Sequence, residues 1–146
     1  MKRKHGWNTW ENHLKVHESV LKRYQDFFVT QNPRYQISKP TTHFYQMKLD
    51  HLQIKTFKAN IVFVYISKDI EIQDGARKKI SRTDAYTFQA WTKNAGSLIR
   101  YCSPHQTHNK FHHKHDYTTK PETLIKIGDD QWPHVSEFFD EIIQNF

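Results

Sequence analysis

Apolar and aromatic side chains recur at alternating intervals of four and three residues near the start of the chain, which is the spacing of one helix face. The residues on this face are Trp10, Leu14, His17, Leu21, Tyr24 and Phe28. Asn8 suits the cap of a helix, and Glu11 follows it three positions later. The pattern predicts an N-terminal helix over residues 9–29 that stops before Pro33, with His17 packed in the fold or facing a partner.

From Thr42 onward the pattern changes to short runs of β-branched and aromatic residues. The runs cover residues 44–49, 52–57, 61–66, 70–72, 86–91 and 97–102. Asn94-Ala95-Gly96 separates the last two runs at hairpin spacing, and the turn at Gln73-Asp74-Gly75 predicts another reversal. We therefore expect a curved antiparallel sheet of about four to six strands over residues 42–127.

The end of the chain returns to helical periodicity. Its apolar face comprises Val135, Phe138, Phe139, Ile142, Ile143 and Phe146. Pro133 suits the first turn of this helix, which is predicted over residues 133–146. A helix, antiparallel strands and a second helix predict one α+β domain, residues 1–146, with the helices on one face of the sheet.

Composition narrows the class of partner. The chain has 146 residues and a formal net charge of +7, and 36% of its residues are hydrophobic and 14% aromatic. This balance predicts a small aromatic core and favours nucleic acid as the partner. No apolar stretch resembles a membrane span or a signal core, so we expect a cytoplasmic protein that does not contact the membrane. The single cysteine, Cys102, excludes an internal disulfide and a zinc site of four cysteines.

Five of the eleven histidines lie between residues 105 and 115, beside several lysines and an arginine. Cleavage of RNA needs a base for the 2′-hydroxyl, an acid for the leaving oxygen and cations for the phosphate, but no cofactor. If residues 111–116 are extended, His113 and His115 point to one face and His112 and Lys114 to the other. We predict His113 and His115 as base and acid in either order, with His105 as a substitute for either.

The remaining polar and aromatic residues of this segment suggest substrate contacts. Arg100, Lys110 and Lys114 are predicted to bind phosphate, and Tyr101 and Phe111 to stack a base. Three other interpretations stay open: a solvated basic loop, phosphate binding without catalysis, and zinc held by Cys102, His105, His112 and His115.

The segments Ser97-Leu98-Ile99-Arg100-Tyr101, Pro104-His105 and Phe111-His112-His113-Lys114-His115 resemble the TumE-type toxins of prokaryotic toxin and antitoxin pairs. The resemblance covers about the last 95 residues and is specific between residues 97 and 116. The residues that fall on the family pattern are Arg100, Tyr101, His105, His112, His113 and His115. Cys102 and Ser103 depart from it, because the family has an aspartate and an asparagine there.

This resemblance implies a small cytoplasmic toxin that acts on RNA and is neutralised by an antitoxin encoded beside it, often with a helix-turn-helix. It adds His112 and Tyr101 to the candidate catalytic residues. We therefore expect a metal-independent endoribonuclease toxin that uses the histidine cluster. The alternatives are a non-catalytic subunit that binds nucleic acid or antitoxin, and a metal-dependent nuclease. The two amphipathic helices also make a homo-oligomer an expectation.

Overall fold

The computed structural model of the chain describes residues 3–104 and 110–146. Two helices and a 3₁₀ turn accompany eight strands. In chain order the elements are β1 (Asn8–Thr9), α1 (Trp10–Arg23), the 3₁₀ turn Gln25–Phe27, β2 (Gln36–Ser38), β3 (Phe44–Lys55), β4 (Ile61–Asp74), β5 (Lys79–Thr92), β6 (Gly96–Cys102), β7 (His112–Asp116), β8 (Thr123–Ile127) and α2 (Val135–Asn145).

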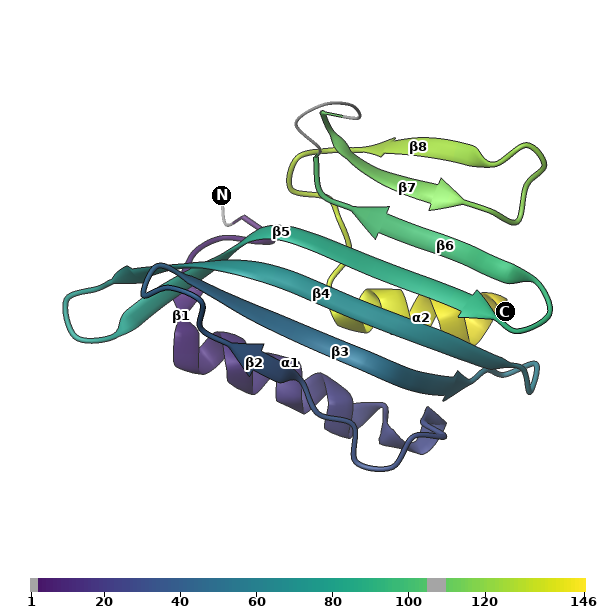
Figure 1. Cartoon of the computed structure of the whole chain (residues 1–146), viewed down its shortest axis with the longest axis horizontal. Coiled ribbons are helices and arrows are strands. Elements are labelled where there is room, and N and C mark those ends of the chain that lie inside the picture. The colour runs from purple at the N-terminus through teal and green to yellow at the C-terminus, as the bar shows by residue number, and fades with distance from the viewer. Residues whose placement is uncertain (1–2, 105–109) are drawn as a thin grey trace.

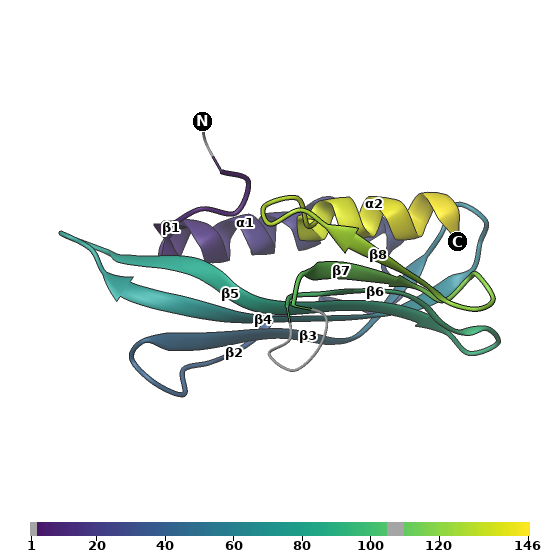
Figure 2. The same ribbon diagram turned by 90° about the horizontal axis from the view of Figure 1, so that it is seen from above.

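One antiparallel sheet organises the molecule. Its strands follow the order β2-β3-β4-β5-β6-β7-β8, so each long strand pairs with its neighbour in the sequence, and the short β1 pairs with β5. Both helices lie over the same face of this sheet, and no helix formed by residues 3–104 or 110–146 lies on the opposite face (Figures 1 and 2). The predicted α+β architecture is confirmed. We call the face without helices the outer face.

The strand count is higher than the four to six predicted, since β1, β2, β7 and β8 are short and lack a clear apolar alternation. The N-terminal helix is shorter than predicted, because α1 ends at Arg23 and a 3₁₀ turn continues to Phe27. Its cap is Thr9, whose hydroxyl accepts from the Asn12 N–H at 3.1 Å. The hairpin through Asn94-Ala95-Gly96 is confirmed, and Gly96 adopts the left-handed backbone, with a φ of 73°, that such a turn requires.

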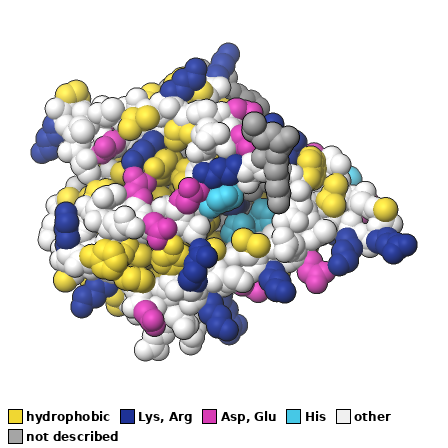
Figure 3. All heavy atoms as spheres, turned by 180° about the vertical axis from the view of Figure 1, so that it is seen from behind, with side chains coloured by type: hydrophobic (Ala, Val, Ile, Leu, Met, Phe, Trp, Pro, Cys, Tyr) yellow, Lys and Arg dark blue, Asp and Glu magenta, His cyan; other side chains and the backbone are white. Residues whose placement is uncertain are grey.

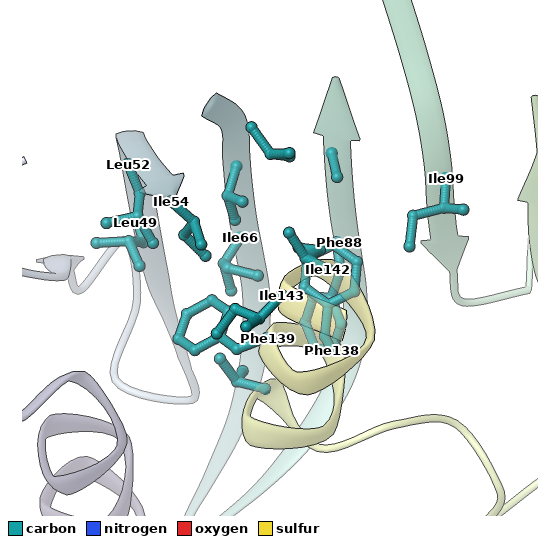
Figure 4. Close-up of a cluster of buried hydrophobic side chains, with 14 of the residues drawn as sticks. Leu49, Leu52, Ile54, Ile66, Phe88, Ile99, Phe138, Phe139, Ile142 and Ile143 are labelled. Carbon is teal, nitrogen blue, oxygen red and sulfur yellow. The ribbon is translucent and has the colours of Figure 1, made fainter. Parts of the chain in front are cut away.

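The core lies between α2 and the inward side chains of the sheet. Phe138, Phe139 and Ile142 are fully buried and pack against the centre of the sheet (Figure 4). Phe88 of β5 meets the Phe138 ring at 5.6 Å between ring centres. The apolar face predicted for the C-terminal helix is therefore the face that fixes α2 on the sheet. Among the described residues, no helix combines the length and apolar character needed to cross a bilayer.

Candidate functional site

Strands β6 and β7 bring together the predicted arginine and two of the predicted histidines. Arg100 lies opposite His115, and Cys102 lies opposite His113, in the antiparallel register. Residues directly opposite one another share a face of the sheet. These four side chains lie on the outer face, because the residues between them point toward α2. We call them the β6–β7 cluster.

Hydrogen bonds fix the orientation of both imidazoles in the cluster. Arg100 Nη2 lies 3.2 Å from His115 Nε2, and a guanidinium can only donate, so this histidine nitrogen accepts. The proton of His115 is then on Nδ1, which lies 3.8 Å from the Glu122 carboxylate. His113 Nδ1 donates to the Phe111 carbonyl at 2.9 Å, which places the lone pair of His113 on Nε2.

Burial separates the roles available to the two histidines. Their rings meet edge to face with centres 4.9 Å apart, and the His115 ring stacks on Tyr117. His113 has no exposed surface, whereas 9% of His115 is exposed. His115 is therefore the more accessible of the two imidazoles, although both are buried.

The cluster also offers donor atoms for a metal ion. One donor atom from each of Cys102, His113 and His115 lies within 4.8 Å of the others. A tetrahedral zinc site, with bonds of about 2.0–2.3 Å, needs donors roughly 3.4–3.8 Å apart, so these side chains would have to close slightly around an ion. Burial raises the pKa of the Cys102 thiol, and the Arg100 guanidinium opposes this effect. A thiol and two imidazoles are ligand types that suit zinc.

Of the four residues whose spacing predicted a zinc site, His112 does not lie near Cys102 or His115. His112 lies on the opposite face, where its Nδ1 is 2.9 Å from the Tyr86 hydroxyl and its ring stacks parallel to that of Trp132. Burial lowers the pKa of His112, although Asp129 opposes this shift. The strand alternation that brings His113 to Cys102 therefore takes His112 away from it. His105 lies outside the described residues.

Two other predicted contacts also lie on the helix side. The Tyr101 hydroxyl donates to Glu141 of α2 at 2.6 Å, and Lys114 forms an ion pair with the same carboxylate. Lys114 therefore does not share a phosphate site with Arg100, as the predicted grouping assumed, and Tyr101 does not face the cluster. Lys110 is exposed just before β7. Phe111 packs edge to face on His113.

Glu141 anchors β6 and β7 to α2, and this yields a prediction about stability. We expect Glu141→Gln to lower the free energy of unfolding by about 1–3 kcal/mol, because Lys114, with 17% of its side chain exposed, loses its charged partner. Urea unfolding monitored by tryptophan fluorescence measures the change. Glu11→Gln is the matched control, since 79% of the Glu11 side chain is exposed. Equal stability of the two variants would contradict an anchoring role.

A row of outward residues on the outer face was missed at the sequence level. The cross-strand register aligns Tyr65, Gln89, Arg100 and His115 across four strands. Beside this row Phe63 and Trp91 stack with ring centres 5.9 Å apart. All of these side chains except His115 are partly exposed. The alternation of residues 61–66 contained this signal, because its outward positions carry aromatic residues where a solvated face would carry polar ones.

No protein-family model, curated protein or solved structure matches the chain. The Arg100 guanidinium and the His115 imidazole lie side by side, near the partly exposed rings of Phe63 and Trp91. That combination suits a phosphodiester joined to bases.

Proposed function

We propose that the protein is a TumE-type toxin that binds single-stranded RNA on the outer face and cleaves it at the β6–β7 cluster. The observation that carries this proposal is the pairing of Arg100 with His115 at 3.2 Å, at the end of a row of outward side chains. A cation beside an imidazole supplies both the phosphate contact and the base that transesterification of RNA needs.

The chemical step follows from the hydrogen bond between these residues. A phosphate entering the site draws the Arg100 guanidinium to its oxygens, which releases the lone pair on His115 Nε2. The 2′-hydroxyl oxygen then bonds to phosphorus while its proton passes to His115, and the bond from phosphorus to the 5′ oxygen breaks. The departing oxygen takes a proton from water, and the hydroxide that remains takes the proton from the His115 imidazolium, which restores the base. The products end in a 2′,3′-cyclic phosphate and a 5′-hydroxyl.

His113 serves as a positioning residue in this scheme. Its full burial and its hydrogen bond to the Phe111 carbonyl hold the ring against His115. The assignment of His113 and His115 as an acid and base pair is thereby refined to a base, His115, with His113 behind it. Such support keeps a catalytic ring in one orientation.

The aromatic residues of the outer face suit the bases of the same strand of RNA. Phe63 and Trp91 lie beside the row that contains Arg100 and His115, on the same face. Aromatic rings on an open sheet stack bases without reading their sequence strongly. A strand bound here would place its phosphates toward Arg100.

We expect Trp91→Ala to lower the affinity for a single-stranded RNA by about 5- to 150-fold, which corresponds to the loss of one stacked base at about 1–3 kcal/mol. Fluorescence anisotropy with a labelled oligonucleotide measures the change. Phe57→Ala is the control, since Phe57 is 68% exposed in the turn between β3 and β4 and lies away from the outer row. If Trp91→Ala binds the RNA as tightly as the wild type, the outer face is not the RNA-binding surface.

The proposal is tested by incubating labelled RNA with the protein, purified without a histidine tag, in the presence and absence of EDTA. We expect cleavage in both conditions and 2′,3′-cyclic phosphate ends. RNA binding without cleavage in any condition would instead indicate a non-catalytic RNA-binding subunit.

A metal-dependent nuclease is the second candidate, and the grouping of Cys102, His113 and His115 favours it specifically. Zinc bound there would act as a Lewis acid on the phosphate that Arg100 holds. Loss of cleavage in EDTA, together with stoichiometric zinc in the purified protein, would replace the metal-independent reaction with this one. Cys102→Ser would then lose zinc as well as activity.

The proposed cellular setting is the cytoplasm, with an antitoxin encoded beside the toxin and often bearing a helix-turn-helix. A cytoplasmic ribonuclease without its inhibitor should stop growth. Expression of the chain alone in a bacterial host tests this, and co-expression with the neighbouring reading frame should restore growth. Normal growth of cells that contain abundant folded protein would contradict the proposed toxin function.

A further inference from the structure

Lys68 of β4 is a buried amine on the helix-bearing face of the sheet. It is 4% exposed, and its Nζ lies 5.5 Å from the Trp132 ring and 5.9 Å from the Phe88 ring. Among the described residues no carboxylate forms an ion pair with it. A buried ammonium without a counter-ion is costly, and burial lowers the pKa of Lys68 to about 7.

The hydrogen-bond partner of Lys68 is a neutral histidine of α1. His17 Nδ1 donates to the His13 carbonyl at 2.8 Å, so the lone pair of His17 is on Nε2. Lys68 Nζ lies 2.9 Å from that nitrogen and donates to it. His13 stacks on His17 with ring centres 4.5 Å apart. Burial is the main reason that the pKa of each of these histidines is low, so they add no charge near neutral pH.

Lys68 and His17 line the wall of an open cavity that runs along α1, from Asn12 to Arg23, and reaches the start of α2. The cavity has a volume of about 450 Å³. Histidine side chains gather in a hollow on this face of the molecule (Figure 3). The cationic residues that line it are Lys15, Arg23 and Lys68, and none of the described lining residues is acidic. A volume of this size suits a small organic molecule.

The first turn of α2 lines the cavity with N–H donors. Val135 and Ser136 belong to this turn and line the wall, and the N–H groups at a helix start have no partners within the helix. The Glu137 carboxylate of the same turn accepts from the His134 N–H at 2.8 Å and forms an ion pair with Lys4. The hydroxyls of Ser19 and Ser136 supply further donors. Beside these polar groups lie Val16 and Val20, so the lining is cationic in one part and apolar in another.

We propose that this cavity is a binding site for a small phosphorylated molecule with an apolar body, whose phosphate group supplies the counter-ion that Lys68 lacks in the protein. The phosphate would lie among Lys68, Arg23 and the start of α2, with the apolar body against the valines. This site is independent of the RNA site, because Lys68 faces the helices whereas the β6–β7 cluster lies on the outer face.

The test compares phenyl phosphate, inorganic phosphate and phenol at constant ionic strength, using the full chain labelled with ¹³C-lysine. We expect saturable shifts of the Lys68 signal with both phosphates, about tenfold tighter for phenyl phosphate because its ring buries apolar surface, and none with phenol. Lys68→Met should weaken phenyl phosphate binding by about 10- to 100-fold, measured by calorimetry. Lys55→Met, which removes an exposed lysine of β3, should not.

Far-UV circular dichroism establishes that Lys68→Met is folded, and Arg23→Gln provides a second variant that leaves the buried amine intact. A weaker affinity in Arg23→Gln would support the site even if Lys68→Met misfolds. Equal affinity in wild type and both variants would overturn the proposal. Absence of saturable binding by either phosphate, or binding of phenol as tight as that of phenyl phosphate, would also overturn it.

Discussion

Replacing His115 with asparagine is expected to lower the rate of RNA cleavage by about 100- to 10,000-fold, the usual contribution of a general base. Asparagine keeps a carbonyl oxygen that can accept from Arg100 Nη2, which lies 3.2 Å from the imidazole in the native protein. It has no group that can take the 2′-hydroxyl proton. The affinity for RNA should therefore stay within about twofold of the wild type.

Single-turnover cleavage and anisotropy measure the two quantities separately. His43→Asn is the matched control, because His43 is exposed in the loop before β3 and lies far along the sheet from the β6–β7 cluster. If His115→Asn cleaves as fast as wild type while His43→Asn is also unaffected, His115 is not the base and the proposed step fails. Loss of binding in His115→Asn would instead assign this histidine to substrate contact.

Phe138→Ala is expected to lower the free energy of unfolding by about 3–5 kcal/mol, the range for removing a large aromatic side chain from a core. Phe138 has no exposed surface, and its ring lies 5.6 Å from Phe88 and 5.9 Å from Tyr101. A cavity at this point would loosen α2 from the centre of the sheet. Since the free energy of unfolding of a small domain is about 5–15 kcal/mol, the Phe138→Ala variant should be marginally stable.

Urea unfolding at equilibrium gives the value for Phe138→Ala, and Phe57→Ala serves again as control because its ring is exposed. The control should change stability by no more than about 1.5 kcal/mol, the upper value for its edge-to-face contact with Phe27. A loss below about 1 kcal/mol in Phe138→Ala would mean that α2 contributes little to holding the sheet. The sheet would then be held together mainly by contacts other than those with α2.

The sequence pattern predicted both helices and the central strands because their apolar residues follow one clear period. It failed where a structural irregularity changed that period. The predicted run 44–49 and the first part of the run 52–57 form one strand, β3, which ends at Lys55. Its register shifts between Leu49 and Leu52, with a φ of 59° at His51. A bulge of this kind exchanges the inward and outward positions, so the alternation reads as two strands.

The division of β4 into two predicted runs has a different cause. The inward positions of this strand are Val62, Val64, Ile66, Lys68, Ile70 and Ile72. Lys68 takes one of these positions, and a lysine on the buried face interrupts the apolar alternation. The place where the local rule failed is therefore the place where the structure has its buried amine. Its partner His17 could not be predicted, because 51 residues separate the two.

The candidate RNA site was predictable in part. Alternation along residues 111–116 correctly separated His113 and His115 from His112 and Lys114. The pairing of Arg100 with His115 depends on the register of two strands, which a single sequence does not fix. In the same register Tyr101 and Lys114 point toward Glu141 of α2. Fewer cations therefore lie on the outer face than the number of basic residues in this segment had indicated.

The strict alternation across β6 and β7 limits how this segment can change in length. Loss of His112 or His113 would turn over every later side chain of the strand, so Lys114 would point to the outer face and His115 toward Glu141. Substitutions at single positions leave this parity intact. Deletion of an odd number of residues within β7 should therefore disrupt the fold. The turn between β7 and β8, at residues 117–122, has no alternation of inward and outward side chains, so a change in its length should be tolerated better.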